Sequence, residues 1–273
     1  MEQNVVALAE QVAVEAAREA GAAALRLFHS GFTVREKDAS GDLLTEADLE
    51  AEQAILTQLR SVFPDHQIRS EESGWSGVKG DWLWLVDPLD GTNNFAIGLP
   101  VFGVSLTLIY RNEPVLGVIY DTAQDQVYIA RKGQGAFRNG KALHIEARLN
   151  PGKLTLGWIQ GHQVQHDPRA GLLRRHIEAN TKRLMRLWAP TLQWAMLARS
   201  TIDGVVLYNS EGDDLYSGLL LVKEAGCVVV NFDGTPFTGM NPEPFLIACP
   251  PERKEALLQL VQAGLELHPL QRT

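Results

Sequence analysis

The sequence is poor in cysteine, in positive charge and in long apolar runs, and each shortage excludes a class of protein. Two cysteines among 273 residues, Cys227 and Cys249, are too few for a disulfide framework. Lys and Arg number 25 against 33 Asp and Glu, a net charge of −8, which argues against a nucleic-acid partner, because such proteins carry a clustered basic face. No segment reaches the roughly 18 consecutive apolar residues of a membrane span, so no membrane partner is expected.

The chain also lacks internal repeats, low-complexity blocks and a Gly/Ser/Pro-rich linker that would divide it. Its first residues lack the basic start and apolar run of a signal peptide, so we expect a cytoplasmic protein. Hydrophobic residues make up 45% and charged residues 21%, which allows a substantial core. The length fits about two average domains or one large one.

Hydrophobic periodicity places helices and strands in separate blocks. Expected helices cover 1–30, 45–60, 214–225 and 251–265, the second opening with Thr45 and Asp48 as a capping box. Expected strands cover 82–87, 101–110, 114–120, 127–130, 135–137 and 228–230. Strands that follow one another in sequence, with the helices segregated, predict a layered α+β fold rather than an alternating parallel-sheet fold.

The most informative segment is Asp87-Pro88-Leu89-Asp90-Gly91-Thr92. An apolar strand delivers two carboxylates three residues apart, and Pro88 fixes the turn between them. Gly91 and Thr92 follow where a helix could begin, and free amides at a helix start favour anions. Mg²⁺ prefers carboxylate and carbonyl oxygens, with phosphate as a natural partner. The alternative is a hairpin turn at Asp-Gly with solvated acids.

Other acidic residues are ambiguous when taken singly. Glu71 and Glu72 could form a metal site or a solvated acidic turn. Asp214, beside Asp213, could bind a metal or cap the helix that follows it, and capping is also a sufficient role for Asp48.

In their fixed order these segments resemble the inositol monophosphatase family of Mg²⁺-dependent, lithium-sensitive phosphatases. The matching segments cover nearly the whole chain and are Asp42 to Asp48, Glu71-Glu72-Ser73, Trp84 to Phe95, Gly133 to Ala136 with Asn139-Gly140, and Asp214 ahead of Glu224-Ala225-Gly226. The resemblance implies an α-β-α-β-α sandwich, assembled as a homodimer. It also implies one domain over residues 1–273, with a metal- and phosphate-binding half of about 1–145 and a substrate-side half of about 146–273.

The resemblance further implies residue roles for a phosphomonoesterase that acts on a small phosphorylated substrate. Two or three Mg²⁺ ions would be held by Glu71, Asp87, the Leu89 carbonyl oxygen, Asp90 and Asp214. The amides of Gly91 and Thr92 would bind the phosphate. Asp48 with Thr92 would orient the attacking water, and Glu72 would support the metal ligands, so these three form the expected catalytic set.

The sequence departs from the family where the leaving group would bind. Asp213 stands where the family usually has Trp, and could enter the metal shell or face water; we favour water. Leu207 occupies the position of a glutamate that contacts an inositol hydroxyl, and Trp188 falls near a Gly-Ser/Thr pair of the family. We therefore expect Trp188, Leu207 and Asp213 to line the substrate pocket and to alter the choice of leaving group.

Several interpretations stay open. Candidate substrates are inositol phosphate, histidinol phosphate, a sugar bisphosphate and a nucleotide 3′-phosphate; the missing glutamate disfavours the first, and the lack of a clear basic set disfavours the last. His162 and His166 lie four apart, but Gly161 and Pro168 favour a loop over a metal pair. The rival function is a regulatory or binding partner, since family members can serve in transcription complexes. Intact acids at every ligand position favour the enzyme.

Overall fold

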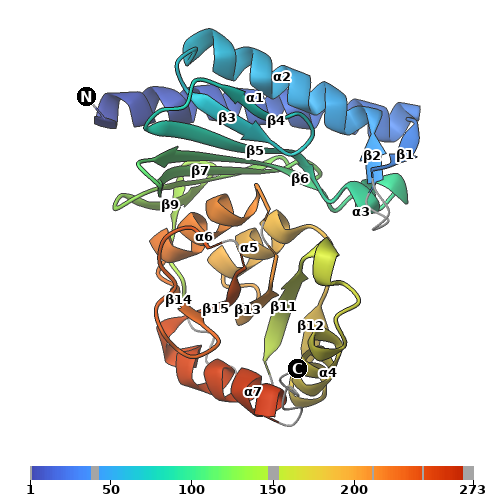
Figure 1. Ribbon diagram of the computed structural model, residues 1–273, viewed down its shortest axis with the longest axis vertical. Helices are drawn as coiled ribbons and strands as arrows, with labels where there is room; N and C mark the ends of the chain where they lie inside the picture. Colours follow the sequence, from blue (N-terminus) through green and yellow to red (C-terminus); the bar gives the residue numbers. More distant parts are fainter. Residues whose placement is uncertain (1, 38–42, 147–153, 211, 242, 267–273) are drawn as a thin grey trace.

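The computed structural model describes residues 2–37, 43–146, 154–210, 212–241 and 243–266, so Asp42 of the first motif lies outside the described residues. Figure 1 shows five layers. The outer helices α1 (Glu2–Ser30) and α2 (Glu46–Val62) cover the first sheet, α5 (Pro190–Ala198) and α6 (Leu215–Glu224) lie between the sheets, and α4 (Pro168–Asn180) and α7 (Lys254–Glu266) cover the second. The predicted α-β-α-β-α fold is confirmed.

The first sheet has eight strands in the order β10-β9-β8-β7-β6-β5-β3-β4. Neighbours are antiparallel except β3 and β5, which are parallel. The strands are β3 (Gln67–Ser70), β4 (Gly74–Gly77), β5 (Trp82–Asp90), β6 (Gly103–Tyr110), β7 (Glu113–Asp121), β8 (Gln126–Arg131), β9 (Gly135–Arg138) and β10 (Lys141–Leu143). A separate antiparallel pair, β1 (Val34–Glu36) and β2 (Leu43–Thr45), precedes α2.

The second sheet has five strands in the order β12-β11-β13-β15-β14. Strand β11 is parallel to both its neighbours, and the remaining pairs are antiparallel. The strands are β11 (Thr155–Gln160), β12 (Arg183–Met185), β13 (Gly204–Tyr208), β14 (Val228–Asn231) and β15 (Phe245–Cys249). Three short helices complete the described chain: α3 (Thr92–Ala96), η1 (His162–Val164) and η2 (Pro251–Arg253).

Most element boundaries fall close to the predicted ones, and the differences have local causes. The capping box is present: the Thr45 side chain accepts from the Ala47 amide, and the Asp48 carboxylate accepts from the Thr45 amide. Strand β5 runs on to Asp90, three residues further than predicted, because a shift in its pairing with β6 lets it continue past Pro88.

Apolar residues fill the spaces between the layers. One cluster joins α1 and α2 to the first sheet, a second fills the space around α5 and α6, and a third lies under α4 and α7. The Gly133-to-Ala136 motif contacts the Glu224-Ala225-Gly226 motif in the fold, because Glu224 of α6 accepts hydrogen bonds from the backbone amides of Gly133 and Gly135 at 2.7 and 2.8 Å. In the described chain, no helix has both the length and the hydropathy needed to cross a membrane.

Candidate active site

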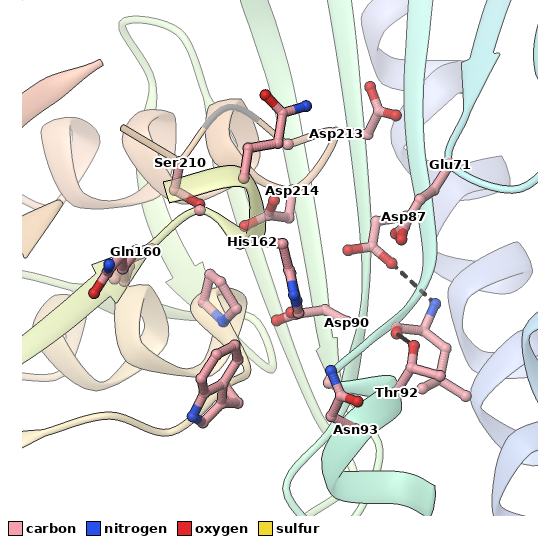
Figure 2. Close-up of a pocket in the computed structure, with 18 of the residues that line it drawn as sticks. Glu71, Asp87, Asp90, Thr92, Asn93, Gln160, His162, Ser210, Asp213 and Asp214 are labelled. Atoms are coloured by element: carbon pink, nitrogen blue, oxygen red, sulfur yellow. Dashed lines mark hydrogen bonds between the residues drawn. The ribbon is translucent and has the colours of Figure 1, made fainter. Parts of the chain in front are cut away.

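Strand β5 brings Asp87 and Asp90 to one cavity. Side chains alternate along a regular strand, so residues three apart would face opposite sides of the sheet. The pairing with β6 shifts between Asp87 and Asp90, a stretch that contains Pro88, and such an irregularity turns the side chains that follow it. Both carboxylates therefore line the same cavity (Figure 2). The hairpin alternative is wrong, because Gly91 precedes helix α3.

Helix α3 begins at Thr92, directly after Gly91, a position where the backbone conformation requires glycine. Gly91 has a φ of +100°, and a Cβ there would lie 2.8 Å from the Val101 carbonyl oxygen. The Thr92 hydroxyl donates to Asp48 Oδ1 at 2.8 Å, while the amide and hydroxyl of Thr45 donate to Asp48 Oδ2 at 2.7 and 2.6 Å. The capping of α2 thus fixes the Asp48–Thr92 pair beside amides that have no partner within α3.

The turn after β3 carries Glu71 and Glu72, and α2 holds it in place. Glu52 of α2 is buried and accepts hydrogen bonds from the Ser70 hydroxyl and from the amide and hydroxyl of Ser73, the last two at 3.0 Å. These bonds flank the two glutamates on both sides. The direction in which Glu71 and Glu72 point therefore depends on a residue about twenty positions earlier in the sequence.

Lys37, which follows β1, is a charged partner that the sequence analysis missed. Its ammonium donates to Glu71 Oε1 at 2.8 Å and to Glu72 Oε1 at 3.0 Å. Burial lowers the pKa of Lys37, but the two carboxylates more than offset this and raise it overall. A fully solvated acidic turn is wrong for Glu72, whose side chain is 4% exposed. Burial, followed by the charge of Glu71, raises the pKa of Glu72 to about 7.

Asp214 enters the cavity from the start of α6, and the labelled carboxylates of Asp87 and Asp214 come from different elements in Figure 2. Capping does not explain Asp214, because its side chain makes no capping bond to α6. Its neighbour Asp213 is buried and pairs with Arg69 Nε at 3.1 Å. The expectation that Asp213 faces water is therefore wrong, since this ion pair takes up its charge.

The carboxylates of the cavity disfavour one another's charge. Burial raises the pKa of Asp90 to about 7, even though the amide and hydroxyl of Thr191 donate hydrogen bonds to it. Burial, followed by the charge of Glu71, raises the pKa of Asp87 well above its usual value, and burial followed by Asp90 does the same for Asp214. Bound cations are the usual means by which such clusters stay ionised.

The donor set fits a hard cation. It consists only of oxygens, from four carboxylates and one backbone carbonyl, which is the set that Mg²⁺ prefers: Glu71, Asp87, Leu89, Asp90 and Asp214. As they are placed, no three or more His, Cys, Asp or Glu side chains of the described residues are grouped closely enough to hold a metal ion. Protein donors hold two of these carboxylates, since Lys37 bonds Glu71 and Thr191 bonds Asp90. A bound cation would compete with Lys37 for Glu71.

A cavity of about 570 Å³ extends from these acids toward the second sheet. Strands β11 and β13 are parallel, with Gln160 paired to Tyr208, so the residues that follow both strands leave the sheet at the same edge. Gly161, His162, Asn209 and Ser210 line the cavity from there, and Figure 2 shows the His162 side chain pointing into it. From the sequence alone, His162 has no assigned role. The signal that would have found it is the carboxyl end of a parallel strand, where ligands commonly bind.

Of the three residues expected at the substrate pocket, two line the cavity, namely Trp188 and Asp213. Leu207 does not: it is 1% exposed and belongs to the apolar cluster around α5 and α6, so that expectation is wrong. The cavity wall also includes Arg69 and Arg186, which the sequence analysis did not recognise as a basic set because they lie 117 positions apart.

Comparisons with known proteins agree with this geometry. The profile of the inositol monophosphatase family matches residues 7–266. The chain is 34% identical over 232 residues to the Nus factor SuhB of Pseudomonas aeruginosa, and 33% identical over 226 residues to the inositol-1-monophosphatase of Mesorhizobium japonicum; each alignment covers 82% of this chain and 85% of the relative. The solved structure of extragenic suppressor protein suhB from Bartonella henselae matches with a TM-score of 0.86 at 27% identity, over 94% of this chain and 99% of that one.

These matches confirm the resemblance found in the sequence. Members of the family use Mg²⁺, and membership supports phosphatase activity and metal binding. Both the family profile and the solved structure cover nearly the whole chain, so the likeness is not confined to the acidic motifs. The chain belongs to the inositol monophosphatase family.

Proposed function

We propose that this protein is a Mg²⁺-dependent phosphomonoesterase that hydrolyses a small phosphorylated alcohol. The observation that carries the proposal is the convergence of Asp87, Asp90 and Asp214 on one cavity beside the first amides of α3. Oxygen donors next to an anion-binding helix start are what a phosphate ester with its cations requires. Buried acids that raise one another's pKa are costly, and a catalytic role accounts for their presence.

The chain's own residues position the reacting groups. The amides of Gly91 and Thr92 bind the phosphate oxygens, and the Thr92 hydroxyl, fixed by Asp48, accepts a hydrogen bond from the attacking water. Because Thr45 occupies the other oxygen of Asp48, the carboxylate is held as an acceptor toward Thr92. Mg²⁺ held by Glu71, Asp87, Leu89, Asp90 and Asp214 would lower the pKa of the water and neutralise the charge of the phosphate.

The proposal includes the finer expectations that follow from the resemblance. They are two or three Mg²⁺ ions, support of the ligands by Glu72, inhibition by lithium, a homodimer, one domain over residues 1–273 and a cytoplasmic location. Inositol phosphate, histidinol phosphate, sugar bisphosphates and nucleotide 3′-phosphates are the first substrates to try. Arg186 in the cavity wall weakens the ground for disfavouring nucleotides, whereas Arg69 is paired with Asp213.

The direct test is phosphate release from a panel of phosphomonoesters, with Mg²⁺, with EDTA, and with lithium added to Mg²⁺. We expect release that requires Mg²⁺ and that falls when lithium is added. Calorimetric titration of Mg²⁺ into the same preparation shows whether the metal binds. Bound Mg²⁺ with no release from any ester on the panel would contradict the proposal.

A second candidate is a binding or regulatory role, which the name of the Pseudomonas relative, a Nus factor, favours. Against it, each proposed oxygen donor is in place, including Asp214 within its altered motif. Such a role predicts the fold and Mg²⁺ binding without phosphate release, so the panel and the calorimetric titration separate the two candidates.

A further inference from the structure

The backbone of Trp188 has a conformation that bulky residues rarely adopt. Its φ is +54°, in the left-handed region. Seven described residues other than glycine have a positive φ, and Trp188 is the one with an aromatic ring; the full set is Arg111, Asn112, Asp125, Asn139, Trp188, Ser200 and Asn209. This conformation is unfavourable for a bulky residue and persists only where the surrounding structure enforces it.

Hydrogen bonds on both sides of Trp188 tie its segment to the proposed reaction centre. On the N-terminal side, the side-chain Nδ2 of the buried Asn94 donates to the Leu187 carbonyl at 2.6 Å, and Asn94 belongs to α3, the helix that begins with Thr92. On the C-terminal side, the Thr191 amide donates to Asp90 Oδ2 at 2.7 Å. The indole is therefore presented by a backbone that is bonded to the metal- and phosphate-binding segment itself.

Two further planar groups adjoin the indole and line the same cavity. The Arg186 guanidinium carbon lies 5.0 Å from the centroid of the Trp188 ring. The His162 ring, which comes from the end of β11, has its centroid 5.3 Å from that of Trp188, with 52° between the planes. Figure 2 shows the His162 side chain inside the cavity, and all three residues belong to the cavity wall. We call Arg186, Trp188 and His162 the planar wall.

The planar wall differs chemically from a site built for a polyol. Of the described residues that line the cavity, the carboxylates are those of the acidic cluster and Asp213, which is paired with Arg69. Leu207 lies in the core and offers no acceptor for a hydroxyl group. Indole, imidazole and guanidinium groups bind other planar rings by stacking and by cation–π contact.

We propose that the planar wall recognises the leaving group, and that the preferred substrates are phosphomonoesters whose alcohol carries a planar aromatic ring. This inference rests on the proposed phosphatase function. Trp188 is the residue that determines specificity, and its left-handed backbone is the means by which the indole reaches the leaving-group side. Stacking of a base on one aromatic side chain contributes about 1–3 kcal/mol, which corresponds to a preference of roughly five- to 150-fold.

Three esters with the same ethyl phosphate core test the inference: 2-phenylethyl phosphate, 2-cyclohexylethyl phosphate and ethyl phosphate. Their leaving alcohols have similar intrinsic reactivity, so the ratios of kcat/KM report recognition. We expect the phenyl ester to exceed the cyclohexyl ester by about tenfold, a ratio within the range for one stacked ring. Trp188→Gly, which suits the left-handed backbone, is expected to bring that ratio close to one, and Trp188→Phe to restore most of it.

Trp75→Ala is the matched control, because Trp75 also lines the cavity but is 59% exposed on β4. It is expected to keep the wild-type ratio. Equal hydrolysis of the phenyl and cyclohexyl esters by the wild type overturns this inference and leaves the phosphatase proposal standing. A preference that disappears in Trp75→Ala but survives in Trp188→Gly also overturns it. If no phosphomonoester is hydrolysed in a Mg²⁺-dependent reaction, both proposals are overturned.

Discussion

Asp90 combines two roles in one side chain. One of its oxygens accepts from the Thr191 amide, and its charge belongs to the proposed metal site. Asp90→Asn keeps the shape and one carbonyl oxygen but loses the charge, so we expect phosphate release to fall by about 100-fold or more, with an unchanged circular dichroism spectrum. The control is Asp81→Asn, because Asp81 forms an exposed pair with Arg111. Activity near the wild-type level in Asp90→Asn would contradict the assignment of Asp90 as a metal ligand.

Leu207 shows that a residue can align with a pocket position of the family and still lie in the core. Its alignment with a hydroxyl-binding glutamate predicted a pocket residue, but the structure places it in the core. Leu207→Glu would bury a charge without a partner, so we expect a loss of about 3 kcal/mol or more in the free energy of unfolding. Urea denaturation measures it. A stable variant with a new preference for polyol phosphates would contradict the core placement.

Helix α2 is the element on which several site residues depend. Asp48 and Glu52 lie four positions apart and so share a helix face. Asp48 fixes Thr92 at the start of α3, while Glu52 fixes the turn after β3 that bears Glu71. A carboxylate that only orients a metal ligand typically contributes a factor of about 10 to 100 in metal affinity.

We therefore expect Glu52→Ala to raise the Mg²⁺ concentration needed for half-maximal activity by about tenfold, while kcat at saturating Mg²⁺ changes less. The matched control is Glu50→Ala on the same helix, since Glu50 pairs with Arg26 at the surface. Activity assays over a range of Mg²⁺ concentrations separate the two effects. An unchanged Mg²⁺ dependence in Glu52→Ala would show that the turn does not need this carboxylate.

Local patterns allowed several of these elements to be predicted, and contacts distant in sequence account for the rest. The capping box at Thr45, the strand before Asp87 and the helix after Asp214 follow from neighbouring residues. Lys37 and His162 could not be placed in this way, because the packing of remote segments brings Lys37 to Glu71 and brings His162 to the cavity wall. The register shift in β5 was also missed, since it depends on the pairing with β6.

At the scale of the whole molecule, the candidate site lies where the first and second halves of the chain are bonded to each other. The Arg69–Asp213 ion pair, the bond from Thr191 to Asp90 and the bond from Asn94 to Leu187 each join the first half of the chain to the second. The same region concentrates acids with raised pKa values. The electrostatics of the site should therefore affect the stability of the entire fold.

The sign of that effect follows from the direction in which folding moves the pKa values. Asp90 has a pKa of about 7 in the fold against an ordinary value of 3.8, and the pKa values of Asp87 and Asp214 are raised too, so the folded state binds protons more tightly than the unfolded chain. This contribution is fully present below about pH 4 and is lost as the pH rises through about 7. A tenfold change in proton affinity on folding corresponds to about 1.4 kcal/mol, and each kcal/mol to about 2–4 °C in the melting temperature.

We therefore expect the melting temperature of the protein in EDTA to fall between pH 5 and pH 8, and Mg²⁺ to reverse most of the fall, because the cation favours the ionised carboxylates. Other groups also titrate in this range, so the comparison that isolates the cluster is wild type against Asp90→Asn. Because the substitution removes one acid that resists ionisation, the melting temperature in EDTA should fall less between pH 5 and pH 8 than it does in the wild type. A wild-type melting temperature that rises from pH 5 to pH 8 in EDTA, with the same slope in Asp90→Asn, would show that these carboxylates are not held protonated by the fold.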